Sequence, residues 1–172
     1  MLYLFVEGAD DRRLVNVLFH NTEEKSIIEY SRRNNSSIAK FIRALNGTSD
    51  RYIFFADSDT KSMDQRKSDI KTKFKSINED QIVIVCIEIE SWYYAGMNVE
   101  LCQKNKIKFK DDANRVSKEG FLSLIKKCSL QKTEIMIEVA KMFDVDLARK
   151  RNASFSDFYD RYIKNEEPTK AV

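Results

Sequence analysis

Acidic residues follow three of the four apolar runs within residues 1–90, and their types and spacing suit metal binding. They are Glu7 and Asp11, Asp57 and Asp59, and Glu88 and Glu90. Two like charges about 4 Å apart repel by about 4 kcal/mol at an effective dielectric near 20, so a fold that gathers them needs a cation or a proton. Hard divalent cations favour oxygen ligands. Because the sequence has one His and three widely spaced Cys, Mg²⁺ or Mn²⁺ fits better than Zn²⁺.

Each acidic pair also has a simpler interpretation. Glu7 and Gly8 suit an ordinary turn at the end of a strand. Asp57 and Asp59 can cap a helix that begins near Thr60. Glu88 and Glu90 can occupy the first turn of a helix, where the macrodipole favours acids. The common position after successive strands favours one shared metal site over three local roles.

Alternating apolar runs and helical patterns predict the elements that position these acids. The expected strands cover residues 2–6, 26–31, 52–56 and 81–87, with helices between them. Such alternation is typical of an α/β domain with a mostly parallel sheet. The sequence therefore predicts a Rossmann-like core with a four-stranded sheet. In open sheets of this kind, ligands bind beyond the carboxyl ends of the strands.

The remainder of the chain differs, because helical patterns replace the strands. Helices are expected near residues 91–103, 118–128, 132–143 and 154–164. The alternating segment from Lys104 to Lys110 fits either an edge strand or an exposed loop. We expect an α/β core over residues 1–97 and a mainly helical C-terminal cap over residues 98–172, packed as one compact domain.

Composition excludes several other chemistries. The four glycines do not form GxxxxGK[ST] or GxGxxG, so no phosphate-binding glycine loop is present. No apolar run approaches the roughly 20 residues that span a bilayer, and scattered cysteines, odd in number, fit reduced thiols. We therefore expect a cytoplasmic protein without membrane contact. The net charge of +3 gives no strong signal for nucleic acid.

Basic and hydroxyl side chains in the second half are candidates for contacts with phosphate. They are Lys132, Arg149, Lys150, Arg151 and Ser154. Lys and Arg bind phosphate through charge and, for Arg, through a fork of donors. Cations are equally favoured at the ends of solvated helices, and Ser154 also suits the N-cap of the helix that follows it. Both interpretations stay open.

Longer motifs carry a resemblance to a known family. The segments Phe5–Asp11 and Phe54–Asp59 resemble the Toprim domain of topoisomerases, bacterial-type primases and nucleases of the overcoming-lysogenization-defect type. The segment Val85–Ala95, with its Glu-x-Glu-Ser-Trp motif, and the segment Arg151–Phe155 are similar to parts of small stand-alone Toprim-like proteins. The resemblance covers most of the chain and implies a Toprim core.

The resemblance also implies roles for the acids. Glu7, Asp57 and Asp59 would form the catalytic centre. The implied metal ligands are Glu7, Asp11, Asp57, Asp59, Glu88 and Glu90. Where the family pattern leads us to expect a further acid after the Trp-containing turn, this chain has Gly96. That departure counts against a second metal held from this position.

The function implied by the resemblance is cleavage of phosphodiester bonds in DNA or RNA, dependent on Mg²⁺ or Mn²⁺. A chain of 172 residues has no room for the strand-passage scaffold of a topoisomerase, and no priming elements are recognisable. The alternative is a non-catalytic nucleic-acid-binding or regulatory subunit. A third alternative is a subunit that works with a separate ATPase partner, since related nucleases are fused to an ATPase or encoded beside one.

Overall fold

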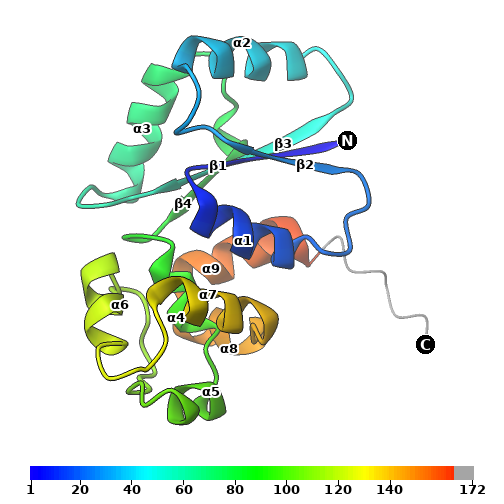
Figure 1. Ribbon diagram of the computed structural model, residues 1–172. Helices are drawn as coiled ribbons and strands as arrows, with labels where there is room; N and C mark the ends of the chain where they lie inside the picture. Colours follow the sequence, from blue (N-terminus) through cyan, green and yellow to red (C-terminus); the bar gives the residue numbers. More distant parts are fainter. Residues whose placement is uncertain (165–172) are drawn as a thin grey trace.

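A sheet of four parallel strands forms the centre of the computed structural model, which describes residues 1–164. The strand order is β2, β1, β3, β4 (Figure 1). The strands are β1 (Leu2–Val6), β2 (Lys25–Glu29), β3 (Arg51–Asp57) and β4 (Ile82–Val85). The α/β prediction is confirmed, and all four expected strands are present with ends that differ by no more than two residues.

Helices cover both faces of the sheet. On one face, strand residues such as Phe54 pack against α2 (Asn35–Leu45) and α3 (Met63–Lys73). On the other face, residues such as Phe55 pack against α1 (Ala9–Leu18) and the helices of the second half (Figure 1). Successive side chains of a strand point to opposite faces, so runs that are apolar throughout suit a sheet buried on both sides.

The second half of the described chain is helical. Its helices are α4 (Glu90–Ala95), α5 (Val99–Lys104), α6 (Lys118–Leu124), α7 (Lys132–Lys141), α8 (Val145–Arg151) and α9 (Ala153–Phe158), followed by a π-helical turn (Tyr159–Ile163). The prediction of one helix over residues 91–103 is wrong. Helix α4 ends before Gly96, and the side chain of Asn98 accepts a hydrogen bond of 2.8 Å from the N–H of Leu101 to begin α5. Helix α8 is absent from the sequence-based expectations.

The segment from Lys104 to Lys110 leaves α5 and enters an irregular connection. It pairs with none of the four strands found within residues 1–164. The edge-strand interpretation is therefore wrong, and the segment is a loop whose lysines are exposed, whereas Asn105 and Ile107 are buried. No helix of the described chain combines the length and the apolar character needed to cross a membrane.

Aromatic side chains join the sheet to the C-terminal helices. Trp92 is fully buried and packs edge-on against Phe55, with ring centroids 6.3 Å apart. Phe158 lies against Phe55 at 5.5 Å and against Phe19 at 6.0 Å. One apolar core thus includes the sheet, α1 and the cap. The last part of the expected cap, residues 165–172, lies outside the described residues.

Candidate carboxylate site

The parallel sheet brings the ends of β1 and β3 together at one edge. Phe5 of β1 is opposite Phe54 of β3, so Glu7, two residues further on, lies beside the end of β3 at Asp57. Asp11 joins them because α1 begins directly after the turn at Gly8. The carboxylates that act electrostatically on Asp57 are Asp11, Glu7, Glu90 and Asp59. Five of the six acids singled out in the sequence therefore belong to one electrostatic cluster.

Asp57 is the most strongly perturbed acid of this cluster. Burial, followed by the negative charges of Asp11 and Glu7, raises the pKa of Asp57 to about 9. Its Oδ1 atom is buried without a hydrogen-bond partner among the described residues. A buried polar atom in this condition costs about 1–3 kcal/mol. Asp57 therefore needs a proton or a cation that the described protein does not supply.

Asp11 shares this condition. Its side chain closes the first turn of α1, where Oδ2 accepts a hydrogen bond of 3.2 Å from the N–H of Gly8. Oδ1 has no partner in the described part of the chain. Burial raises the pKa of Asp11 to about 7, and the charges of Glu7 and Glu90 act in the same direction.

Tyr30 completes this part of the site and is missing from the sequence-based candidates. Its hydroxyl donates a hydrogen bond of 3.4 Å to Glu7 Oε2, and its ring stacks on Phe54 with centroids 4.6 Å apart. Burial and then the charges of the nearby acids, Glu7 first, raise the pKa of Tyr30 well above its usual value. The signal for this residue is its place directly after β2, since side chains that follow neighbouring parallel strands meet at the same edge.

Lys132 neutralises a second part of the cluster. Its Nζ lies 2.9 Å from Asp10 Oδ2 and 2.7 Å from Glu90 Oε1. Arg13 adds a cation 2.8 Å from Asp10 Oδ1. Burial opposes ionisation of Asp10, but the hydrogen bonds from Arg13 and Lys132 outweigh it and lower the pKa of this acid. Glu7, Asp11 and Asp57, which we call the unpaired acids, have no cation at ion-pairing distance in residues 1–164.

Two of the predicted ligands lie at the margin. The side chain of Asp59 is 56% exposed and its Oδ2 lies 3.9 Å from a guanidinium nitrogen of Arg66. Glu88 accepts a hydrogen bond from the N–H of Lys118 at the start of α6. Glu88 is therefore engaged by the cap and is not among the carboxylates that act on Asp57.

The turns that carry these marginal residues are strained. Asp59 and Ile87 have φ angles of 53° and 63°, in the left-handed region. The N–H of Asp59 donates to the carbonyl oxygen of Ile87 at 2.9 Å, and the N–H of Ile87 donates to Ser58 Oγ at 2.8 Å. A branched residue in this conformation costs about 1–3 kcal/mol, and such strain clusters at functional sites. The two turns are thus fixed to each other beside the unpaired acids.

Arg151 does not lie where a phosphate at the surface could reach it. It is 4% exposed, and Nη1 donates to three carbonyl oxygens at the end of α4, each at 2.9 Å. Those oxygens belong to Tyr94, Ala95 and Met97. The charge therefore caps a helix end inside the protein, which corrects the expectation of a phosphate contact.

Ser154 is buried in a similar way. Its Oγ accepts hydrogen bonds from Trp92 Nε1 at 2.9 Å and from the N–H of Cys86 at 3.1 Å. The N-cap of α9 is Asn152, whose side chain accepts from the N–H of Phe155. Neither the phosphate interpretation nor the N-cap interpretation of Ser154 therefore fits the structure. The residue ties the Glu-x-Glu-Ser-Trp turn to the cap.

The other basic candidates divide between two locations. Arg149 stacks over the ring of Tyr159 at 4.3 Å and pairs with Asp160 at 3.2 Å, while Lys150 is exposed. Neither makes an ion pair with the clustered acids. Among the five residues predicted to contact phosphate, Lys132 is the one that lies within the carboxylate cluster.

Gly96 stands where the family pattern suggests an acid, and the structure gives a physical reason. A Cβ atom added to Gly96 would lie 2.3 Å from the nearest ring carbon of Phe143. Real Cβ atoms do not approach so closely. A side chain at this position therefore requires the ring of Phe143 to shift.

The donor set suits a hard divalent cation, since it consists of carboxylate oxygens and includes two buried oxygens without partners. It is not a preformed coordination shell. Within residues 1–164, no three or more His, Cys, Asp or Glu side chains converge closely enough to hold a metal ion. A bound cation would have to draw the unpaired acids together.

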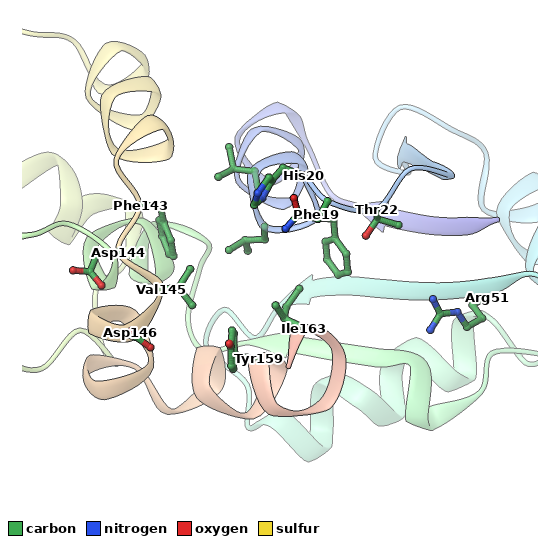
Figure 2. Close-up of a pocket in the computed structure, with 13 residues that line it drawn as sticks. Phe19, His20, Thr22, Arg51, Phe143, Asp144, Val145, Asp146, Tyr159 and Ile163 are labelled. Carbon is green, nitrogen blue, oxygen red and sulfur yellow. The ribbon is translucent and has the colours of Figure 1, made fainter. Parts of the chain in front are cut away.

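A cavity of about 770 Å³ lies elsewhere in the molecule. Its lining includes Phe19, Phe143 and Tyr159, with Arg51 and Asp146 among its polar residues (Figure 2). It adjoins the last residues of α1, whose ten residues extend about 15 Å from the acidic end. The cavity is therefore separate from the carboxylate site.

Comparisons with known proteins add no relative. Protein-family models, curated proteins and solved structures were searched, and none matches this chain. The residues and their geometry are therefore the basis on which a function can be assigned.

Proposed function

We propose that the carboxylate cluster binds Mg²⁺ or Mn²⁺ and that the protein hydrolyses phosphodiester bonds of nucleic acid. The observation that carries the proposal is the pair of buried, unpartnered oxygens on Asp11 and Asp57. A fold that buries two such acids beside Glu7 without a cation is destabilised, either by their repulsion or by the cost of keeping them protonated. A divalent cation relieves that repulsion and uses oxygens of this kind as ligands.

The residues have different roles in this proposal. Glu7, Asp11 and Asp57 hold the ion, with Asp59 at the exposed margin of the same cluster. When bound, the ion supplies charge stabilisation at the phosphate and lowers the pKa of an attacking water. Lys132 pairs with Glu90 at 2.7 Å and fixes the position of its carboxylate. The hydroxyl of Tyr30 orients Glu7 through its hydrogen bond of 3.4 Å.

The Toprim-like motifs support the same activity. Glu7, Asp57 and Asp59 stand at the positions that the resemblance makes catalytic, and the parallel sheet places them at one edge. The free thiols of Cys86, Cys102 and Cys128 suit the cytoplasmic location that belongs to this proposal. If nucleotide hydrolysis is coupled to this activity, a separate ATPase partner would have to supply it, because the four glycines form no nucleotide-binding loop.

One observation favours the second candidate, a non-catalytic nucleic-acid-binding or regulatory subunit. The acids of the described chain are not converged as a finished coordination shell. A binding module would keep the acidic crevice without turning over a substrate.

A cleavage assay separates the two candidates. The full chain is incubated with labelled single- and double-stranded DNA and RNA in Mg²⁺, in Mn²⁺ and in EDTA. Asp57→Asn is compared with Asp64→Asn, which removes an exposed acid from α3. The proposal expects metal-dependent cleavage that Asp57→Asn abolishes and Asp64→Asn retains. Cleavage that survives Asp57→Asn contradicts the proposed site, and metal-independent binding without cleavage favours the regulatory subunit.

A further inference from the structure

The connection between α5 and α6 presents an ordered row of lysines to solvent. Four lysines alternate with residues that point inward over residues 104–110. The exposed side chains belong to Lys104, Lys106, Lys108 and Lys110. Between them, Asn105 is 6% exposed, Ile107 is 4% exposed and Phe109 packs partly buried against the core. The alternation therefore separates a charged outer side from an apolar inner side.

Bonds from the interior hold this segment without a neighbouring strand. The hydroxyl of Tyr94 donates to the carbonyl oxygen of Lys108 at 2.6 Å. Arg151 donates through Nε to the carbonyl oxygen of Lys110 at 2.9 Å and stacks over the ring of Phe109 at 4.2 Å. The backbone beneath the lysines is thus fixed at alternate residues, so the positions from which their side chains extend are fixed as well.

The row concentrates the positive charge of the chain. Residues 104–118 contain six Lys or Arg and two Asp, a net charge of +4, whereas the whole sequence carries +3. Lys104 is partly neutralised by Glu138 at 3.3 Å. Lys106, Lys108 and Lys110 have no acid at ion-pairing distance among the described residues. Three cations are therefore available to a ligand outside the protein.

The connection leads to the carboxylate site. It starts at α5, which lies at the end of the molecule away from α2 (Figure 1). It ends at α6, where the N–H of Lys118 donates to Glu88, three residues beyond the end of β4. The neighbouring strand β3 ends at Asp57. A polyanion that followed the connection from the lysines to α6 would therefore reach Glu88, at the margin of the carboxylate site.

We propose that residues 104–118 form a docking surface for the phosphate backbone of nucleic acid and direct it to the carboxylate site. The direction toward cleavage rests on the proposed function, whereas the docking itself does not. Lysines bind phosphates as point charges and carry no base-specific information. The aromatic residue of the row, Phe109, points inward and is not available for base stacking. The expected binding is therefore electrostatic and independent of sequence.

The test measures equilibrium binding of a labelled oligonucleotide of mixed sequence, single- and double-stranded, to the full chain in EDTA over about 50–200 mM salt. Lys106, Lys108 and Lys110 are changed together to Gln. The matched control changes Lys40, Lys73 and Lys75 to Gln, three exposed lysines of α2 and of the end of α3, which lie on the opposite side of the sheet. Circular dichroism verifies that both variants fold.

The variant with Lys106, Lys108 and Lys110 changed to Gln, which we call the row variant, is expected to bind the oligonucleotide at least about tenfold more weakly at low salt. It should also reduce the slope of log affinity against log salt by about 2 on single strands and nearly 3 on duplexes, because each lost phosphate contact removes 0.7–0.9. The control should leave the slope unchanged. An unchanged slope in the row variant, or an equal loss in both variants, overturns the docking surface.

The same measurements keep the two proposals apart. Lysine-dependent binding by a wild-type protein that cleaves nothing in Mg²⁺ or Mn²⁺ contradicts the proposed nuclease and supports the docking surface. Wild-type cleavage that the row variant reproduces at full affinity supports the nuclease and overturns the docking surface.

Discussion

Replacing Asp57 by Asn should stabilise the metal-free protein above neutral pH. Folded Asp57 keeps its proton up to about pH 9, whereas the unfolded chain releases it near the ordinary value of 3.8. Between these values the unfolded state binds fewer protons, so stability falls as pH rises through this window. Asn has nearly the same shape as Asp but does not ionise. The substitution therefore removes the loss of stability that Asp57 causes as pH rises.

The size of the effect follows from the pKa difference. At about pH 8 the gap to the unfolded value is about four units, which at about 1.4 kcal/mol per unit sets an upper limit near 6 kcal/mol. Water entry and movement of the neighbouring acids make the real effect smaller than this limit. We therefore expect Asp57→Asn to raise the free energy of unfolding by about 2–3 kcal/mol at this pH. For a chain of this length that corresponds to a rise in Tm of about 5–10 °C. At about pH 5 the pH is only about one unit above the pKa of Asp57 in the unfolded chain, so Asp57→Asn should raise the free energy of unfolding only slightly.

The assay is thermal unfolding in EDTA at the two pH values, followed by addition of Mn²⁺. Asp59→Asn serves as the control, because its carboxylate is 56% exposed and should give no pH-dependent gain. Mn²⁺ should raise the Tm of the wild type and leave Asp57→Asn unchanged. A loss of Tm in Asp57→Asn that is equal at both pH values would refute the reasoning, because it would mean that the carboxylate makes stabilising bonds.

Three further substitutions test the surroundings. Lys132→Met should lower stability by about 3–5 kcal/mol in urea unfolding, because it leaves a buried carboxylate without its cation; a loss below 1 kcal/mol would contradict this pairing. Ser154→Ala should lower the free energy of unfolding by about 1–3 kcal/mol, because it leaves the indole N–H of Trp92 without its hydrogen-bond acceptor. Its affinity for oligonucleotides should stay that of the wild type, and a selective loss of binding would restore the phosphate interpretation. Gly96→Ala should lower the free energy of unfolding by about 1–3 kcal/mol through overpacking against Phe143, and Tm should fall with it; an unchanged Tm would show that the ring moves aside.

The sheet and the acidic edge were predictable because both depend on local patterns. Apolar runs such as Ile82–Val85 are short and uninterrupted, as expected of strands buried on two faces. Once such strands are taken as parallel, the rule that side chains meet at the carboxyl ends brings Glu7 and Asp57 together. The expected strand over residues 26–31 continues past the end of β2 at Glu29, so Tyr30 is not recognised as a residue that follows its strand.

The remaining features depend on contacts between distant parts of the chain. Lys132 and Glu90 are far apart in sequence, and nothing near either residue predicts their separation of 2.7 Å. Arg151 looks like a surface cation because it follows Arg149 and Lys150, yet it alone points inward to the end of α4. Its burial is decided by carbonyl groups that a local pattern does not reveal.

The contacts of Phe158 have a consequence for synthesis on the ribosome. Its ring lies against Phe19, Phe55 and Trp92, which all belong to the first 100 residues of the chain. The apolar surface that these residues share stays open to solvent until about residue 158 has left the exit tunnel. We therefore expect the nascent chain to expose apolar surface until then, and chaperones commonly act on such intermediates.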